Sequence, residues 1–322
     1  MITIDGSEGE GGGQIIRTAL SLAAITKKPF IIENIRAKRP NPGLQPQHLA
    51  AVKAVRSICR GKIDGAELKS TKFYFQPSEI IGGRYTFDIG TAGSVVLVAQ
   101  TIIPILLFAK KPSVVKIIGG THVMKSPSFD YFEKVFLPPI NMMGANVKAK
   151  MYKAGFYPAG GGEIEIEVIP SNLEGKTKWD GDKKIRAIIT IGKLDDGIAI
   201  REKKIFVQNG IEEIYIRRYE TVSPGNAVIV WRDFCGAYVL GEKGKRAEMV
   251  AQEAVDSLKK ENGEVDHYLA DQLLLYGMLA SGKTTYITSA ITEHLKTNAT
   301  IAKTFIERDI KIREETKKIE IE

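Results

Sequence analysis

The chain has 322 residues, of which 43% are hydrophobic and 26% charged, the balance of a water-soluble globular protein long enough for about two domains. Its two cysteines, Cys59 and Cys235, lie far apart in the sequence, which excludes a disulfide framework or a cysteine-based zinc site and favours a reducing compartment. The formal net charge of +8 favours a polyanionic partner.

No segment is expected to cross a membrane or to direct secretion. The N-terminus lacks a basic and then apolar signal pattern. The longest apolar run, 95–109, contains Gln100 and Pro104 and is too short to span a bilayer. We therefore expect a cytoplasmic protein with no membrane partner.

The first predicted elements are a strand at 2–4, a glycine-rich loop and a helix that begins directly after it. Residues 5–19 read DGSEGEGGGQIIRTA, and this glycine density indicates a backbone with positive φ or a very close neighbour. Because the loop leads into a helix, the free N–H groups and the helix dipole favour an anion. Glu10 beside that anion suggests a bridging divalent cation, and Arg17 offers a phosphate contact. A tight strand-to-helix turn with surface polar residues is the alternative.

Three segments of the chain share one order of elements. Residues 11–35 read as a glycine-containing turn, an apolar helix, a Lys-Lys-Pro turn and a β-rich strand. Residues 87–118 repeat this order, and residues 267–291 form a weaker copy. Each copy is followed by a second helix and closing strands. The pattern predicts an α+β fold of three repeated sheet-plus-two-helix units packed together.

The gap between the second and third copies is long enough for an inserted domain. A polar, turn-rich stretch at 171–183 marks its start. The elements predicted after it are four strands and an amphipathic helix, at 185–191, 214–219, 228–233, 236–240 and 246–260. We therefore expect a large domain of residues 1–180 and 264–322, and a small inserted α/β domain of residues 181–263.

Residues 277–284 read GMLASGKT and match the GxxxxGK[ST] phosphate-binding pattern. That pattern requires a strand before it and a helix after it. Here residues 268–280 have helical spacing, whereas residues 284–288 are β-branched and aromatic, as in a strand. We therefore expect Gly282 to end a helix. A P-loop kinase or ATPase that depends on Lys283 is the alternative.

None of the four histidines is spaced as a zinc-ligand pair. His294 is predicted at the start of the last helix, where the helix dipole favours a neutral, nucleophilic imidazole. A histidine that only caps the helix is the alternative there. His48 has a similar structural interpretation, a solvated imidazole at the start of a helix.

Five segments, DGSEGEGGGQIIRTALSL, RAKRPNPGLQPQHL, FYPAGGGE, YLADQ and EHLKTN, occur in this order and together resemble the RNA 3′-terminal phosphate cyclase family over nearly the whole chain. The resemblance implies three repeated α+β units, like those of the enolpyruvyl transferases, with a smaller inserted domain. It also implies an enzyme that uses ATP and a divalent metal (Mg²⁺ or Mn²⁺) to adenylylate a histidine. Such an enzyme then passes AMP to an RNA 3′-phosphate and closes a 2′,3′-cyclic phosphate.

The resemblance also assigns individual residues. It places the nucleophile on His294 and the metal-binding acid on Glu10. The nucleotide-binding residues that it implies are Gln100, Tyr268, Leu269, Ala270, Asp271 and Gln272. The residues that it implies for the phosphate and the RNA end are Arg17, Arg36, Arg39 and Gln47.

Two further expectations concern these residues. Asp271 is a candidate for orienting His294. Arg39 belongs to the basic loop RAKRPNPG, which we expect to lie away from the His294 segment, with a solvated basic turn as the alternative for the loop. The family also contains inactive relatives used in ribosome assembly, which lack the histidine. A non-catalytic RNA-binding protein is therefore the second candidate function, and the presence of His294 favours the enzyme.

Overall fold

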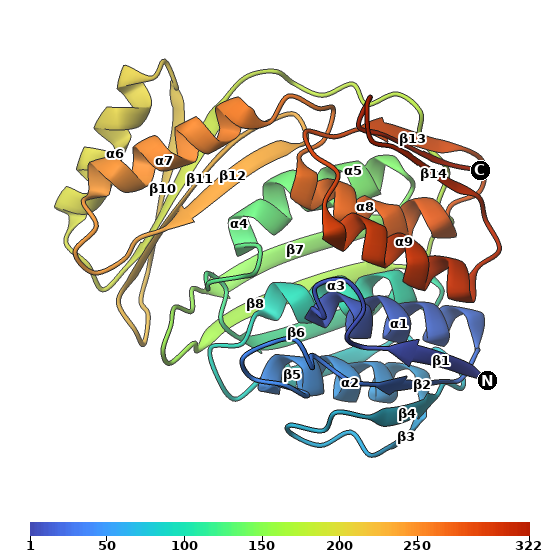
Figure 1. Ribbon diagram of the computed structural model, residues 1–322. Helices are drawn as coiled ribbons and strands as arrows, with labels where there is room; N and C mark the ends of the chain where they lie inside the picture. The colour runs from blue at the N-terminus through green and yellow to red at the C-terminus, as the bar shows by residue number, and fades with distance from the viewer.

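The computed structural model describes residues 1–322 and starts with a four-stranded sheet that carries two helices (Figure 1). Its elements are β1 (Ile2–Asp5), α1 (Gly13–Thr26), β2 (Phe30–Glu33), α2 (Pro46–Cys59), β3 (Lys62–Asp64) and β4 (Phe73–Gln76). The strand order is β1-β2-β4-β3, with β1 and β2 parallel and the other pairs antiparallel. The strand and helix predicted around the glycine loop are confirmed.

A second sheet has the same strand order and the same pattern of parallel and antiparallel pairs, β5-β6-β8-β7. Its elements are β5 (Arg84–Asp88), α3 (Val95–Leu107), β6 (Ser113–Gly119), α4 (Phe129–Tyr131), the π-helix η1 (Phe132–Phe136), α5 (Leu137–Met142), β7 (Asn146–Lys153) and β8 (Gly162–Ile169). Helix α3 is almost entirely buried, because its residues are apolar on every side.

The C-terminal part of the chain forms a three-stranded sheet, β13-β15-β14, whose order corresponds to β2-β4-β3. Its elements are α8 (His267–Leu279), β13 (Thr284–Ile287), α9 (Glu293–Phe305), β14 (Ile310–Arg313) and β15 (Lys318–Ile321). A parallel bridge from Val265 to Thr288 stands where the other two sheets have their first strand.

The segment GMLASGKT runs from helix α8 into strand β13, the reverse of the P-loop order. Gly282 makes the turn with a φ of 75°. Lys283 pairs with the carboxylate of Glu322 on the surface. The structure therefore agrees with the prediction that this glycine ends a helix.

The last sheet, β10-β9-β11-β12, is formed by residues between the second and third groups of elements. Its strands and helices are β9 (Arg186–Gly192), α6 (Asp196–Gln208), β10 (Glu213–Tyr219), β11 (Gly225–Arg232), β12 (Cys235–Leu240) and α7 (Ala247–Lys260). The predicted strands and the helix α7 are confirmed, but α6 was not predicted. Its buried residues are only Ala199, Glu202 and Phe206, so its apolar stripe is too weak to recognise from sequence.

The helices α1, α3, α8 and α9 lie between the sheets and form the centre of the molecule (Figure 1). Helix α1 packs along α9, so the first and the last helix of the chain are neighbours. A separate apolar cluster lies between the β9–β12 sheet and the helices α6 and α7. Both cysteines are buried and free. None of the helices has the length and apolar character needed to cross a membrane.

Candidate functional site

The glycine loop between β1 and α1 is squeezed between two other helices. Gly9 has a φ of 53°, and a Cβ atom there would lie 2.4 Å from Oγ1 of Thr297 in α9. A Cβ atom on Gly13 would lie 2.4 Å from Nε2 of His48 in α2. Larger residues would push the loop away from both helices. The glycines therefore allow the start of α1 to meet α2 and α9.

The first turn of α1 has backbone N–H groups that no side chain caps, although Gly12, Gln14 and Ile15 are themselves buried. Gly12 is the N-cap, and neither a capping side chain nor an acidic residue satisfies the first-turn N–H groups. Uncapped N–H groups and the helix dipole together favour an anion. Burial lowers the pKa of Arg17, one turn further on, to about 10. The sequence prediction of an anion site here is thus matched by a suitable backbone geometry.

His294 is the second residue of α9. Together with Glu10 it borders the space in front of the first turn of α1, which we call the opening. Thr292 caps this helix by accepting a hydrogen bond from the Leu295 N–H at 2.9 Å. The imidazole Nε2 lies 3.8 Å from Oε2 of Glu10, and its side chain is 41% exposed. Two segments from opposite ends of the chain therefore bring the predicted nucleophile and the predicted metal ligand together.

The surroundings of His294 favour its neutral form. Burial is the main cause that lowers its pKa, and the positive charges of Arg17 and Arg39 lower it further, whereas Glu10 raises it. A neutral imidazole has a free lone pair, as a nucleophile requires.

Arg39 contradicts the expectation that its loop lies away from His294. Its guanidinium donates to Oε2 of Glu10 at 3.0 Å, the same oxygen that faces His294. The physical reason is that the basic loop folds onto the glycine loop. The Arg36 N–H donates to the Gly6 carbonyl, and Lys38 Nζ donates to the Gly9 carbonyl at 3.2 Å.

This basic loop is solvated only in part: Ala37, Lys38 and residues 40–42 are exposed, whereas part of each arginine is buried. The Nε atoms of both Arg36 and Arg39 are buried without a hydrogen-bond partner. A buried, unpaired guanidinium N–H is costly unless a ligand supplies the missing acceptor. A phosphate group would supply it, because its oxygens accept from several guanidinium donors at once.

His48 is a functional candidate that sequence reasoning missed, and it is not the solvated imidazole of the alternative. Only 3% of its surface is exposed, and the Gln45 N–H donates to its Nδ1 at 3.1 Å. Burial, with Arg17 and Arg36 nearby, lowers its pKa to about 3. The neutral ring thus carries its proton on Nε2, on the side of Gly13. The Q-x-x-H spacing of a capping box was the available signal.

A polar cavity of about 60 Å³ lies behind this opening, where α1, α3, α8 and α9 meet. Gln100 donates to Gln272 across it, and Nε2 of Gln14 is buried there without a partner. The residues that line the cavity are Gln14, Arg17, Thr18, Ser21, Gln100, Phe136, Asp271, Gln272, Leu275, Tyr276 and Asn298. Three predicted nucleotide-binding residues are therefore close to one another and to Arg17.

Asp271, the candidate for orienting His294, makes no hydrogen bond to this histidine. It accepts a hydrogen bond at 2.6 Å from Thr292, the N-cap of the helix that carries His294. Burial raises the pKa of Asp271 to about 7. This hydrogen bond joins α8 to the N-cap of α9, so the Asp271 carboxyl group fixes the start of the helix that carries His294.

The other predicted residues have different surroundings. Tyr268 is half-exposed beside the His267 ring, with the ring centroids 3.9 Å apart. Leu269 and Ala270 are fully buried, so their side chains face the core and not a ligand. Gln47 accepts a hydrogen bond from the backbone N–H of Ser94, which caps α3. Of these four residues, only Tyr268 therefore has an exposed side chain.

The protein side chains alone do not form a complete metal site. No group of three or more histidine, cysteine, aspartate and glutamate side chains is placed to hold an ion. Glu10, which is 47% exposed at its side chain, supplies one carboxylate. Mg²⁺ is commonly bound by one or two carboxylates together with substrate phosphates and water, so this donor set fits such an ion.

Comparisons with known proteins agree with the resemblance in the motifs. A family model described as RNA 3′-terminal phosphate cyclase matches residues 8–312. A protein of that name from Archaeoglobus fulgidus is 40% identical over 319 residues, which cover 97% of each chain. Another from Sulfurisphaera tokodaii is 43% identical over 329 residues, which cover 97% of this chain and 96% of the relative.

Proposed function

Because this chain belongs to the RNA 3′-terminal phosphate cyclase family of enzymes, we propose that it converts an RNA 3′-terminal phosphate into a 2′,3′-cyclic phosphodiester, with ATP as co-substrate and His294 as the adenylylated nucleophile. One observation carries the proposal. The neutral imidazole of His294 lies 3.8 Å from Glu10, at the uncapped N-terminus of α1.

In the first step, the lone pair of His294 forms a bond to the α-phosphorus of ATP. The bond from that phosphorus to the bridging oxygen breaks, and pyrophosphate leaves with the electron pair. The first-turn N–H groups of α1 and the guanidinium of Arg17 are positioned to stabilise the negative charge of the phosphates.

A divalent cation, Mg²⁺ or Mn²⁺, would bind at Glu10 and neutralise charge on the phosphates. Glu10 is the carboxylate available for it, and the ion pair with Arg39 keeps this carboxylate at the opening. We propose that the side chains of Gln100, Asp271 and Gln272, which line the cavity, contact the nucleoside together with the half-exposed Tyr268.

In the second step, an oxygen of the RNA 3′-phosphate attacks the phosphorus bound to His294, and the imidazole leaves. In the third step, the adjacent 2′-hydroxyl attacks the activated 3′-phosphorus and AMP departs, while the hydroxyl proton passes to solvent. The closing step is intramolecular, so little positioning entropy is lost. We propose that Arg36, Arg39 and Nε2–H of His48 hold the 3′-phosphate, because the Nε atoms of both arginines lack a partner and Nε2 of His48 lies next to Gly13 at the start of α1.

We further propose that the three sheets with corresponding strand orders are repeated units of the enolpyruvyl-transferase kind. The domain boundaries proposed are 1–180 with 264–322 for the large domain and 181–263 for the inserted one. The separate apolar cluster of the β9–β12 sheet supports this division. The free, buried cysteines fit a cytoplasmic location.

The proposal is tested by incubating the protein with α-labelled ATP and Mg²⁺ and looking for acid-labile, base-stable covalent AMP. His294→Ala should abolish the label while circular dichroism shows a folded protein. Thr300→Ala, at an exposed position of the same helix, is the matched control and should keep the label. Label on the folded His294→Ala variant would exclude this nucleophile. A wild-type protein that binds RNA ends but never takes up label would instead be the non-catalytic RNA-binding relative.

A further inference from the structure

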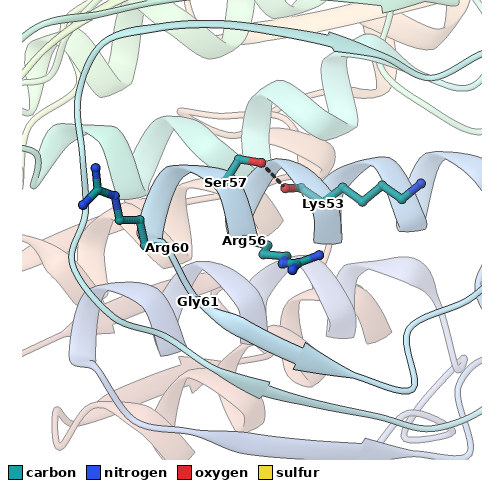
Figure 2. Close-up of a pocket in the computed structure, with 5 residues that line it drawn as sticks. All are labelled: Lys53, Arg56, Ser57, Arg60 and Gly61. Atoms are coloured by element: carbon teal, nitrogen blue, oxygen red, sulfur yellow. Dashed lines mark hydrogen bonds between the residues drawn. The ribbon is translucent and has the colours of Figure 1, made fainter.

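The outer face of α2 and its C-cap carry three cations, Lys53, Arg56 and Arg60, which we call the basic stripe. Figure 2 shows them with Ser57 and Gly61 around an open surface pocket of about 500 Å³. Lys53 and Arg56 lie three residues apart on one side of the helix, and Arg60 follows as its C-cap with a φ of 47°; all three are exposed. No hydrophobic residue lines the pocket.

The positive charge of the basic stripe is not used by the protein itself. None of its three side chains pairs with a carboxylate, and the neighbouring Glu79 is paired with Lys110 at 2.9 Å. Nor do the side chains cap the carbonyl groups at the end of α2. The Arg56 carbonyl accepts from the Gly61 N–H, and the Lys53 carbonyl accepts from the Ser57 hydroxyl at 3.0 Å. The cationic groups therefore remain available to an external anion.

Helix α2 leads directly away from the candidate site. His48, in its first turn, faces Gly13 at the start of α1. A rise of about 1.5 Å per residue puts Lys53 about 8 Å and Arg60 about 18 Å from His48 along the axis. At ~3.4 Å per phosphate of a stacked strand, this distance corresponds to roughly two to five nucleotides.

We propose that the basic stripe binds the phosphodiester backbone of the RNA whose 3′-phosphate occupies the site, two to five nucleotides from that end; this rests on the proposed function. The compact ammonium group of lysine and the forked guanidinium group of arginine both bind phosphate oxygens. A protein partner is disfavoured, because an interface core needs apolar side chains and the pocket has none.

The test compares cyclisation of a dinucleotide 3′-phosphate, too short to reach the stripe, with that of a ten-nucleotide 3′-phosphate. The variant replaces Lys53, Arg56 and Arg60 together with glutamine. We expect kcat/KM for the long RNA to fall about tenfold at 50 mM salt, with the dinucleotide unchanged. For a single strand, three phosphate contacts contribute a slope of about −2 to a plot of the logarithm of the RNA binding constant against the logarithm of the salt concentration. The variant should lose this contribution.

Two control variants separate the stripe from net charge and from folding. Glutamine at Lys203, Lys204 and Lys243, exposed positions outside α2, makes the same charge change and should behave as wild type. The variant Lys53→Arg, Arg56→Lys, Arg60→Lys keeps the charge and should keep the length effect. An unchanged ratio of long to short RNA in the glutamine variant, or an equal loss in the first control, would overturn the inference. Failure of wild type to cyclise even the dinucleotide contradicts the proposed function instead.

Discussion

Arg39 and Glu10 form an ion pair with an N–O distance of 3.0 Å, and the same carboxylate oxygen lies 3.8 Å from Nε2 of His294. The pair therefore joins the basic loop to the proposed nucleophile. Arg39 lowers the pKa of His294 and Glu10 raises it, so the two charges act on one imidazole in opposite directions. Substrate phosphates that attract Arg39 would also change the environment of His294.

The first prediction follows from this arrangement. Arg39→Ala removes a positive charge that lowers the pKa of His294, so that pKa rises and the neutral fraction at mildly acidic pH falls. The rate of AMP labelling should drop, and its acid limb should move to higher pH. Arg39→Lys should restore much of the profile. An Arg39→Ala variant that labels with the wild-type pH profile, yet cyclises RNA poorly, would assign Arg39 to the RNA end alone.

A second prediction concerns the segment GMLASGKT. Lys283→Ala should leave AMP labelling and the apparent KM for ATP unchanged, because Lys283 pairs with Glu322 on the surface and does not line the cavity. Labelling over a range of ATP concentrations is the measurement. Loss of ATP binding in the folded variant would revive the P-loop alternative.

The third prediction concerns Glu202, which is fully buried in α6. Burial raises its pKa to about 7 from 4.5, although the Asn226 amide donates to it. A raised carboxyl pKa disfavours the folded state once pH exceeds the unfolded value, so stability is lost between pH 4.5 and 7. Glu202→Gln removes this loss. Between pH 4 and 8, its unfolding free energy relative to wild type should improve by up to about 3 kcal/mol.

Urea unfolding at the two pH values measures this difference. Any pH-independent effect of the glutamine cancels in the comparison. Glu212→Gln, at an exposed position just before β10, is the control and should track wild type. A constant offset for Glu202→Gln at both pH values would show that the pKa of Glu202 in the folded protein is not raised above its unfolded value.

The fourth prediction separates the chemical steps through the substrate. An RNA with a 2′-deoxy, 3′-phosphate end should accept AMP but not cyclise, since only the 2′-hydroxyl can close the ring. The activated end, with AMP joined through a 5′,3′-pyrophosphate, should accumulate as a slower band on a gel and release AMP with a pyrophosphatase. If the deoxy end gave the same phosphatase-resistant product as the ribo end, cyclisation would not be the reaction. A deoxy end that never accepts AMP would show that the hydroxyl is also needed for binding.

Local patterns alone determined much of this molecule. The glycine loop between β1 and α1, the helix-to-strand order at Gly282 and the helix start at His294 depend on neighbours within a few residues, where backbone preferences dominate. The α6 helix escaped prediction because Glu202 occupies the centre of its buried stripe, and tertiary packing overrides that pattern.

Only the tertiary structure decided which side chains share the opening. The contact of Arg39 with Glu10 required the basic loop to fold over the glycine loop, and the burial of His48 required the start of α2 to pack against Gly13. Asp271 reaches α9 through Thr292 and not through His294, because its carboxyl group meets the N-cap of that helix. Such contacts join residues far apart in the chain, so their geometry depends on packing between elements that no local pattern encodes.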